Sequence, residues 1–412
     1  MKNNRLYIVM VGLPARGKST AATKLKESLK HDSVRTRIFN NGALRRKMVK
    51  GNTSYAGFFD PDNKEGVAVR EKIALINIRR AQRYLNQDGN VAVLDATNVS
   101  RNRREEIQAI LNDHPILFIE CINEDEEILS ASILRKIDMA EFGHMTQEEA
   151  IRSFSERISY YVSIQNPLNE EKNFIKLDSL HNKIIQEKMV DIIPYYDQIR
   201  DFLVADTVKN LYLIRHGETH FNLEDRIGGD SDLTPKGWQQ ARALAEFFKY
   251  KKIPLIFTSQ KKRTIQTAEP IKKRQHDCTI IPLAEFGEID SGICECMSYD
   301  EIRRQMPQIS ETRKKDKYNY VYPDGEGYVT MEDRINRGIK KALYLSDPLD
   351  NIMIVGHRAV NRMILSHFLF RRDEDVPYIY IPQDKFYYIS ATHNKKVFQS
   401  KPYRPKTKFP RV

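Results

Sequence analysis

The stretch Leu6–Ser19, which reads LYIVMVGLPARGKS, decides the fold of the first half of the chain. Its first six residues are apolar or aromatic, which is typical of a strand buried on both faces of a parallel sheet. The next eight, Gly12–Ser19, match the pattern G-x-x-x-x-G-K-[ST], and the residues from there to Lys30 are typical of a helix. The order of strand, glycine-containing loop and helix therefore predicts a loop that binds phosphate groups.

The residue types of this loop indicate which ligand it would hold. Glycines let backbone N–H groups converge on phosphate oxygens, and the N-terminus of the following helix adds the positive end of its dipole. Lys18 can reach the β- and γ-phosphates, and the hydroxyl of Ser19 can ligate Mg²⁺. We therefore predict a site for ATP, with Mg²⁺ at Ser19, whose residues are Gly12, Arg16, Gly17, Lys18, Ser19 and Thr20.

Apolar strands alternate with helical segments downstream of the loop, which indicates a parallel α/β sheet with right-handed crossovers. One of these strands, Val91–Leu94, is followed directly by Asp95, at the edge where such sheets bind ligands. That carboxylate can hold Mg²⁺ through water or orient an attacking hydroxyl. A helix cap is the alternative role for Asp95, but Thr97 or Asn98 would fill that position better.

The same pattern begins again in the second half. Lys183–Asp206 is typical of a helix interrupted by Pro194, and Asn210–Ile214 is then a new buried strand that runs into a sharp loop. A final segment rich in Lys, Arg and Pro is expected to be an extended basic tail. We therefore predict an α/β chain of two doubly wound domains and a tail, at residues 1–207, 208–392 and 393–412.

The loop after the first strand of the second domain carries Arg215-His216-Gly217. A histidine in this position can attack phosphorus if its other nitrogen is fixed and nearby cations neutralise the phosphoryl oxygens. The arginine of the triplet and Arg263 can supply that charge, and His357, beside another glycine, adds a further cation or donor. The leaving alkoxide needs a proton, for which Glu288 is the candidate and Asp290 the less favoured one. This mechanism requires no metal.

Composition narrows the function further. The 412 residues include 67 Lys and Arg against 55 Asp and Glu, a net charge of +12 that favours anionic partners. We expect neither a membrane span nor a secretory signal, because no apolar run reaches about 18 residues and the start of the chain runs directly into a strand. The four cysteines are too few for a disulfide scaffold, and Cys294-x-Cys296 lacks a second pair of metal ligands nearby. A cytoplasmic protein with reduced thiols is therefore expected.

Several motifs together resemble one family. They are GLPARGK at 12–18, Phe39-Asn40, Phe59 with Pro61-Asp62-Asn63, Asp95-Ala96-Thr97-Asn98, Arg215-His216-Gly217-Glu218 and Arg226-Ile227-Gly228-Gly229-Asp230. In this order they resemble the bifunctional 6-phosphofructo-2-kinase/fructose-2,6-bisphosphatase family over about residues 5–390. The resemblance implies a homodimer, with a P-loop domain similar to nucleoside monophosphate kinases ahead of a histidine phosphatase domain similar to phosphoglycerate mutases.

The resemblance implies an enzyme that makes fructose 2,6-bisphosphate from fructose 6-phosphate and ATP and hydrolyses it through a phosphohistidine, so that it controls glycolysis and gluconeogenesis. The implied catalytic residues are Lys18, Asp95, Arg215, His216, Arg263, Glu288 and His357. Those implied to hold fructose 6-phosphate in the kinase are Arg45, Arg70, Thr97, Arg103, Arg157 and Tyr161. Those implied to hold fructose 2,6-bisphosphate in the phosphatase are Arg215, Asn222, Gly228, Tyr299, Arg313, Lys317, Tyr328, Arg358 and Arg362. The kinase would use ATP and Mg²⁺, and the phosphatase no cofactor.

Three positions depart from the family pattern. Asn123 and Ile137 stand where the family has cysteine and lysine, with Cys121 and Lys136 close by in the sequence, and Arg358 stands where the family usually has glutamine. These departures leave open an alternative in which the bisphosphatase dominates and the kinase is weak or altered in substrate.

Two other classes of function are weighed against this reading. A kinase and phosphatase of nucleic-acid ends would need a continuous basic stripe and aromatic stacking platforms, whereas the arginines here gather around two small-molecule motifs. A non-catalytic metabolite-binding scaffold would not need the proposed nucleophile and its acid. We therefore expect sugar phosphates and ATP as partners, with no nucleic acid and no membrane.

Overall fold

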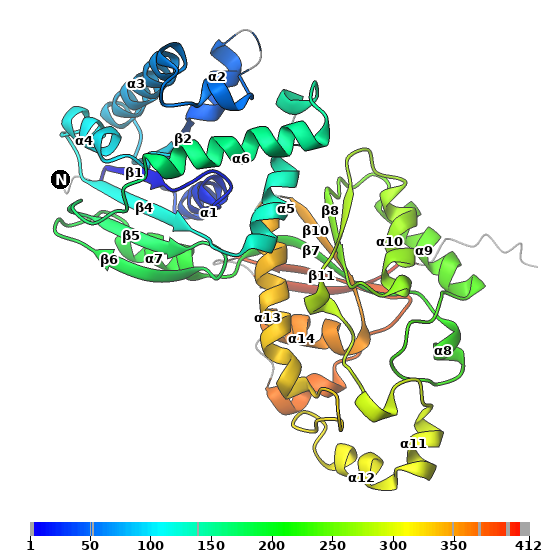
Figure 1. The fold of residues 1–412 in the computed structure, drawn as a ribbon. Helices are drawn as coiled ribbons and strands as arrows, with labels where there is room; N and C mark the ends of the chain where they lie inside the picture. The colour runs from blue at the N-terminus through cyan, green and yellow to red at the C-terminus, as the bar shows by residue number, and fades with distance from the viewer. Residues whose placement is uncertain are drawn as a thin grey trace, which may run out of the picture. The chain divides into compact units, whose positions relative to one another are not determined.

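The computed structural model describes residues 4–49, 51, 53–137, 140–347, 350–369, 372–392 and 396–403. The chain divides into two compact units, Met1–Asp206 and Thr207–Val412 (Figure 1). Each unit contains its own six-stranded sheet with helices on its faces, so the predicted pair of α/β domains is confirmed. Among the described residues, no helix combines the length and apolar character needed to cross a membrane.

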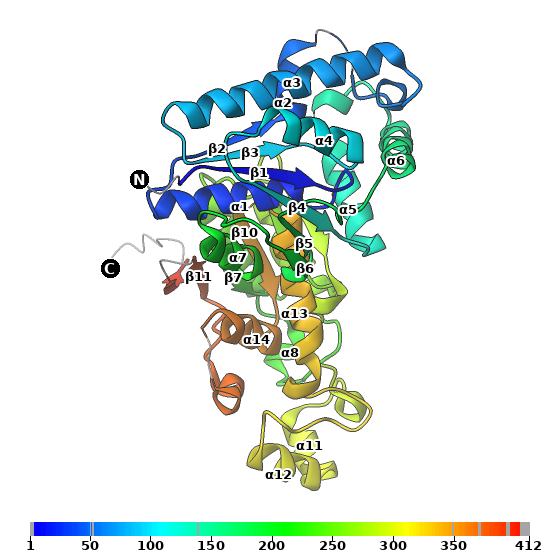
Figure 2. The same ribbon diagram turned by 90° about the vertical axis from the view of Figure 1, so that its left-hand side faces the viewer.

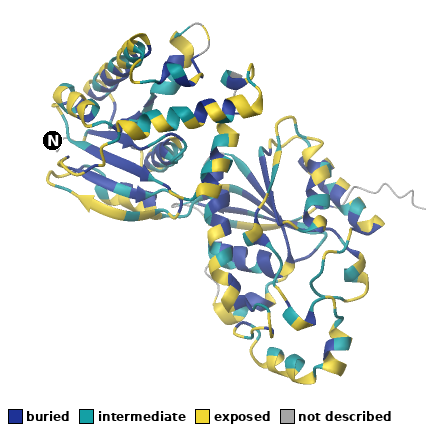
Figure 3. Ribbon diagram, in the orientation of Figure 1, coloured by how far each residue is buried: buried dark blue, intermediate teal, exposed yellow. Residues whose placement is uncertain are grey.

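The sheet of the first unit is mainly parallel. Its strands, in spatial order, are β2 (Thr36–Asn40), β3 (Val91–Asp95), β1 (Leu6–Val11), β4 (Ile116–Ile122), β5 (Phe174–Asp178) and β6 (Lys183–Lys188). The first five are parallel, and β6 pairs antiparallel with β5. Because β1 lies in the interior of the sheet and is covered on both faces, every one of its residues is buried (Figure 3).

Two apolar cores flank this sheet, and the alternation along β1 feeds both of them. Leu6, Ile8 and Met10 face one core, which includes apolar residues of α1 (Lys18–His31) and α7 (Tyr196–Val204). The intervening residues of β1 face the other core. That core includes residues of α3 (Lys64–Asn86) and α4 (Arg101–Ile110), and Figure 2 shows these helices opposite α1.

A smaller helical layer completes the first unit. It contains α2 (Asn41–Met48), η1 (Ala56–Phe58), α5 (Glu126–Ile137), η2 (Ala140–Phe142) and α6 (Gln147–Ser163). Buried Ile137, Phe142 and Phe154 pack together here. The side chain of Asn40 caps α2 by accepting from the backbone N–H of Ala43 at 2.7 Å, so α2 begins directly at the end of β2.

The second unit repeats the layered arrangement with a different strand order. Its sheet runs β12 (Lys396–Pro402), β11 (Lys385–Ala391), β7 (Val208–Arg215), β10 (Asn351–Gly356), β8 (Leu255–Thr258) and β9 (Thr279–Pro282). The last four are parallel, whereas β11 and β12 are antiparallel to their neighbours. Apolar residues of α9 (Pro235–Phe248) and α10 (Lys262–Lys272) pack in one core with alternate residues of β7, β8 and β10.

Among the other helices of this unit, α14 (Arg358–Leu369) contacts β7 and α13 (Tyr328–Leu345), and α13 also contacts η3 (Ala284–Phe286). The longest of them are α13 and α14. Besides η3, the shorter ones are α8 (His220–Leu223), η4 (Gly292–Cys294), α11 (Tyr299–Gln305), α12 (Pro307–Lys315) and η5 (Asp373–Tyr378).

Two expectations from the sequence are wrong. Lys183–Lys188 is the strand β6 rather than part of a helix, and α7 begins after Pro194. The predicted tail at 393–412 begins too early, because Lys396–Pro402 pairs with β11 as β12. In both cases pairing with a neighbouring strand satisfies the backbone of an edge segment that carries few buried side chains. Residues 404–412 of the predicted tail lie outside the described residues.

A buried ion pair fixes the loop that follows β3. Arg104 on α4 is 2% exposed and donates from Nε to the carboxylate of Glu171. Its Nη1 donates to the carbonyl of Val99 at 2.8 Å. The loop that carries Thr97 is therefore tied to α4 and to the segment before β5.

We predict that Arg104→Leu lowers the free energy of unfolding by about 3–5 kcal/mol, because it leaves the Glu171 carboxylate buried without its cation. Urea denaturation followed by circular dichroism measures this change. Arg101→Leu is the matched control: Arg101 is an exposed arginine of the same helix, and its loss should leave the midpoint nearly unchanged. Equal shifts for the two variants would show that the Arg104–Glu171 pair does not fix this region.

Candidate active sites

The first candidate site lies at the carboxyl edge of the first sheet. Asp95, the last residue of β3, is 3% exposed and lies beside Met10 of β1 and Asn40 of β2 in the strand register. Its Oδ2 accepts from the Ser19 hydroxyl at 2.7 Å and from Asn40 Nδ2 at 2.5 Å. The register thus places the predicted carboxylate directly against the phosphate-binding loop.

The glycines of this loop are needed for its conformation. Gly12 has φ +137°, and a Cβ there would lie 2.5 Å from the backbone oxygen of Cys121. Gly17 has φ +80° and immediately precedes α1, so the N-terminus of that helix opens onto the loop. The amide of Gly12 donates to the carbonyl of Thr97 at 3.0 Å, which joins the loop to the segment after β3.

Lys18 lies inside this arrangement with its amino group donating to the Leu13 carbonyl at 2.5 Å. Burial, with a smaller effect from the charges of Arg157 and Lys136, lowers the pKa of Lys18 to about 8, although Asp95 acts in the opposite direction. A buried amino group of this kind gains strongly from an incoming anion. Its surroundings therefore fit a nucleotide phosphate.

The donor set at this edge also fits Mg²⁺. Ser19 and Asp95 offer hard oxygen atoms, which Mg²⁺ prefers, beside a loop suited to phosphate. Over the described ranges, no group of three or more His, Cys, Asp or Glu side chains could form a metal site of its own. A Mg²⁺ ion that arrives with a nucleotide needs no such cage, because it keeps waters and phosphate oxygens as ligands.

Arginines gather beside the loop, around aromatic side chains. Arg45, Arg70 and Arg157 each lie within 6 Å of the ring of Phe59, and the ring of Tyr161 is 6.2 Å from that ring. Arg45 also pairs with the carboxylate of Glu141.

Another arginine lies next to this group. Arg103 pairs with Glu71 and Glu106, and its charge acts on the pKa of Arg70. Five of the six positions implied to hold fructose 6-phosphate thus lie in one group, and Thr97 contacts the phosphate-binding loop through its carbonyl.

Lys136 bears on the departure at Ile137, where the family has a lysine. The residue as a whole is exposed, yet desolvation of its amino group is the main cause that lowers its pKa. Arg135 lowers it further, and the nearby carboxylate of Asp95 acts in the opposite direction. The amino group of Lys136 therefore lies near the first site, whereas Ile137 is buried in a small apolar core.

The second candidate site lies at the carboxyl edge of the second sheet, where His216 follows β7. Its Nδ1 is 2.8 Å from the carbonyl of Gly217, so Nδ1 carries the proton and donates. The lone pair is therefore on Nε2. Burial lowers the pKa of His216 well below the ordinary 6.5, and the charges of Arg263 and Arg215 lower it further. A neutral imidazole with a bare Nε2 is the nucleophilic form.

His357 follows β10, next to β7 in the sheet, and its ring centroid is 5.4 Å from that of His216. Arg263 donates from Nε to Nδ1 of His357 at 3.2 Å. Since a guanidinium has no acceptor, Nδ1 must accept, and Nε2 then donates to the Ser259 hydroxyl at 2.8 Å. His357 is therefore neutral in this arrangement and orients Arg263, so of the two roles that the sequence allowed, cation or donor, the structure favours the neutral donor.

Carbonyl groups hold the two arginines next to His216. Arg263 Nη1 donates to the Gly229 oxygen at 2.7 Å, and Arg215 Nη1 donates to the Ile381 oxygen at 3.2 Å. Burial and, to a smaller extent, the neighbouring cation Arg358 lower the pKa of Arg215 to about 9. Glu288 lies at the start of α14, where its carboxylate accepts from the amides of Arg358 at 3.1 Å and Ala359 at 3.3 Å.

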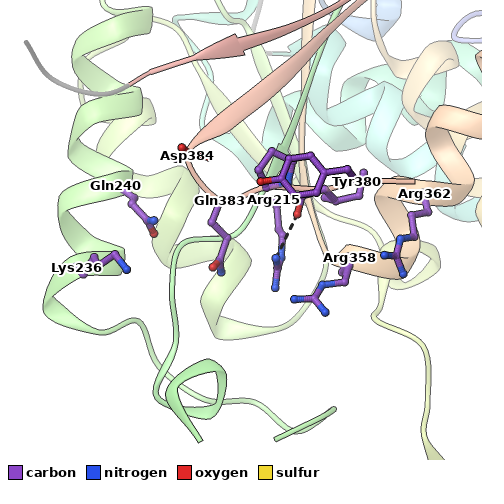
Figure 4. Close-up of a pocket in the computed structure, with 10 residues that line it drawn as sticks. Arg215, Lys236, Gln240, Arg358, Arg362, Tyr380, Gln383 and Asp384 are labelled. Carbon is purple, nitrogen blue, oxygen red and sulfur yellow. Dashed lines mark hydrogen bonds between the residues drawn. The ribbon is translucent and has the colours of Figure 1, made fainter. Parts of the chain in front are cut away.

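A pocket of about 520 Å³ opens beside Arg215 (Figure 4). Figure 4 shows Arg215 and Gln383 between Lys236 and Gln240 on one side and Arg358 and Arg362 on the other. The remaining lining residues are Tyr380, Ile381, Pro382 and Asp384. Cations predominate in this lining, so the pocket suits an anionic ligand.

Three of the positions implied to hold the bisphosphate line this pocket, namely Arg215, Arg358 and Arg362. Arg362 donates to the Tyr328 hydroxyl at 2.8 Å, and Arg313 stacks near the ring of Tyr299 at 5.9 Å. The pKa of Lys317 is lowered to about 8, mainly by burial and then by the charges of Arg313, Arg362 and Arg358. These cations therefore share one electrostatic environment.

Two further positions lie on the His216 side. Asn222 accepts from Gln383 at 2.9 Å, and the backbone of Gly228 leaves room for the Glu295 carboxylate, since a Cβ would lie 2.0 Å from it.

Comparisons with known proteins follow the same division. Residues 1–214 match a family model described as 6-phosphofructo-2-kinase, and residues 211–401 match one described as the histidine phosphatase superfamily, branch 1. The chain is 36% identical over 392 residues to 6-phosphofructo-2-kinase/fructose-2,6-bisphosphatase 4 of Macaca fascicularis, covering 93% of this chain and 81% of the relative. It is also 36% identical over 398 residues to 6-phosphofructo-2-kinase/fructose-2,6-bisphosphatase 3 of Homo sapiens. This match covers 93% of this chain and 74% of the relative.

The chain belongs to the 6-phosphofructo-2-kinase/fructose-2,6-bisphosphatase family. Among solved structures, the alpha-ribazole phosphatase of Shigella flexneri is similar to one half of this family member. It is 23% identical, with a TM-score of 0.43, and the match covers 47% of this chain and 96% of that one.

Sequence reasoning missed several site residues of this family member. Gln383 contacts Asn222 and donates to the His216 carbonyl at 3.3 Å, but it follows the irregular segment after η5, which carries no motif. Ser259 orients His357 from the end of β8, and its position after a buried strand was the available signal. Asn40, noted in the sequence only as part of the Phe39-Asn40 motif, ends β2 just as Asp95 ends β3, and the same strand-end rule assigns it to the site.

We predict that the ring of His216 stays neutral as the pH falls through 6.5, because two guanidinium groups and burial disfavour its protonation. Histidine-selective NMR titration measures this directly. Arg263→Gln removes the largest of the neighbouring charges and should raise the pKa of His216 towards 6.5. Arg242→Gln replaces an exposed arginine of α9 in the same unit and should leave the pKa of His216 unchanged. A His216 resonance that titrates at 6.5 in the unsubstituted protein would disprove this account of the site.

Proposed function

We propose that this protein synthesises fructose 2,6-bisphosphate from fructose 6-phosphate and ATP in its first unit and hydrolyses it in its second. The observation that carries the proposal is the neutral His216, whose Nε2 is bare beside Arg215 and Arg263, in a chain that also holds Asp95 against a phosphate-binding loop. Family membership supports both activities.

In the kinase reaction, the loop residues bind the triphosphate and Lys18 stabilises the charge that develops on the transferred phosphoryl group. The arginines around Phe59 hold fructose 6-phosphate, and Asp95 orients its 2-hydroxyl towards the γ-phosphorus. Mg²⁺, held by Ser19 and Asp95, would neutralise phosphate charge. The 2-hydroxyl oxygen then forms a bond to phosphorus, its proton passes to Asp95, and the bond from the γ-phosphorus to ADP breaks.

In the phosphatase reaction, Nε2 of His216 attacks the 2-phosphate, and the bond from phosphorus to the sugar oxygen breaks. Glu288 gives that oxygen a proton, which releases fructose 6-phosphate. Water then attacks the phosphohistidine and gives a proton to Glu288 as phosphate leaves. Arg215 and Arg263 stabilise the phosphoryl oxygens throughout, and no metal takes part.

The proposal extends to the metabolic role, cellular location, oligomeric state and partners of the enzyme. The two reactions oppose each other, so their ratio would set the level of fructose 2,6-bisphosphate and thereby control glycolysis and gluconeogenesis. We propose a cytoplasmic homodimer whose partners are ATP and sugar phosphates.

Phosphorus NMR of the protein with MgATP and fructose 6-phosphate tests both activities. We predict that His216→Ala accumulates a 2-phosphate signal, because the phosphatase has lost its nucleophile, while the unsubstituted protein shows less of that signal and more inorganic phosphate. Lys18→Met is the matched control and should abolish the signal in both backgrounds. Absence of the signal although ATP binds would leave the bisphosphatase as the dominant activity.

We predict that Arg358→Gln raises phosphatase turnover or weakens product inhibition, because Arg358 adds a cation next to Arg215 that holds the leaving phosphate. Steady-state assays with added inorganic phosphate measure both quantities. Exposed Arg372, on the same unit, serves as a control in the variant Arg372→Gln. Unchanged turnover and inhibition in Arg358→Gln would show that this cation is not used.

A further inference from the structure

Three arginines from three different helices of the first unit share one aromatic ring. The guanidinium carbons of Arg157 on α6, Arg45 on α2 and Arg70 on α3 lie 3.8, 5.1 and 5.9 Å from the ring centroid of Phe59. Phe59 is 4% exposed, and Phe58 packs edge to face against it at 5.2 Å. The ring is therefore fixed in place and is a common contact of all three cations.

Such a cluster of cations is unfavourable without an anion. Burial and, to a smaller extent, the neighbouring charge of Arg45 lower the pKa of Arg157 to about 10. Burial likewise lowers the pKa of Arg45 and of Arg70. Glu141 pairs with Arg45 and, at 3.5 Å, with Arg46. The charge of Glu141 also acts on Arg157, and Arg70 donates to the Phe58 carbonyl with the charge of Glu71 nearby. The ring of Phe59 is the neutral contact that the three arginines share.

An aromatic face can hold a guanidinium without using its hydrogen-bond donors. The ring quadrupole attracts the cation through its flat face, while the N–H groups point outward in the guanidinium plane. In the described part of the chain, the buried Nε of Arg45 and of Arg157 has no hydrogen-bond partner. A carboxylate in place of the ring would occupy these donors and compete with an incoming phosphate.

We propose that Phe59 is a positioning residue of the kinase: its ring holds Arg45, Arg70 and Arg157 as a preassembled clamp for the sugar phosphate and leaves the Nε donors of Arg45 and Arg157 available. The inference rests on the proposed function, since it assigns this clamp to fructose 6-phosphate. The ring is expected to affect the binding of fructose 6-phosphate and not that of ATP, because ATP binds to the separate loop Gly12–Ser19.

The test replaces Phe59 with phenylalanine analogues that carry two to four ring fluorines. These analogues keep the shape of the ring but weaken the attraction of its face for cations. We expect the KM for fructose 6-phosphate to rise stepwise with fluorination, and by about tenfold in Phe59→Leu. The KM for ATP and the kcat should stay within about twofold. Phosphatase activity of the same molecules reports that the chain is intact.

Phe118→Leu is the matched control. Phe118 is a core ring of the same unit, 1% exposed, that packs with apolar residues. Its loss should lower stability without a selective rise in the KM for fructose 6-phosphate. A KM that does not change across the fluorinated series, or that rises equally for both substrates, would overturn the proposal for Phe59. If the unsubstituted protein itself shows no saturation with fructose 6-phosphate, the proposed kinase function fails instead.

Discussion

Mutual repulsion among buried cations is the constraint on which both sites depend. Arg215, buried among other cations, has its pKa lowered to about 9, and Arg157 is in a similar position in the first unit. Each site holds at least one of these arginines with a neutral group, although carboxylates pair with others, as Glu141 does with Arg45. Carbonyl oxygens hold Arg215 and Arg263, and the ring of Phe59 contacts Arg157. Neutral partners leave the positive potential undiminished, so an arriving phosphate meets charges that are already in place.

Strand order provides the other half of each site. In the second unit, β7 and β10 are neighbours with Arg215 opposite Gly356, and the amide of His216 donates to the Gly356 oxygen at 3.0 Å. The two histidines therefore come together through backbone pairing, although 140 positions separate them in the chain. In the first unit, the same parallel arrangement places Asp95 and Asn40 side by side. The sheet edge thus fixes the reactive groups, and the loops add the cations.

The difference between groups fixed by the sheet edge and groups added by loops explains what could be predicted from the sequence. The strand, loop and helix at Leu6–Ser19 were predictable because apolar runs and glycines act locally, and Asp95 and His216 were predictable because strand ends meet at one edge. Gln383 was not, since it acts through contacts with residues more than 160 positions away and no motif surrounds it. β6 and β12 were missed because edge strands bury few side chains and show little apolar alternation.

The buried amino group of Lys18 has a thermodynamic consequence for ligand binding. With a pKa of about 8, it is partly deprotonated in mildly alkaline solution. A phosphate placed against it favours the ammonium form and raises that pKa, so the protein takes up a fraction of a proton as the ligand enters. Part of the heat of binding then comes from the buffer that gives up this proton. The observed enthalpy would therefore differ between buffers of different ionisation heat, even though the contacts formed are the same.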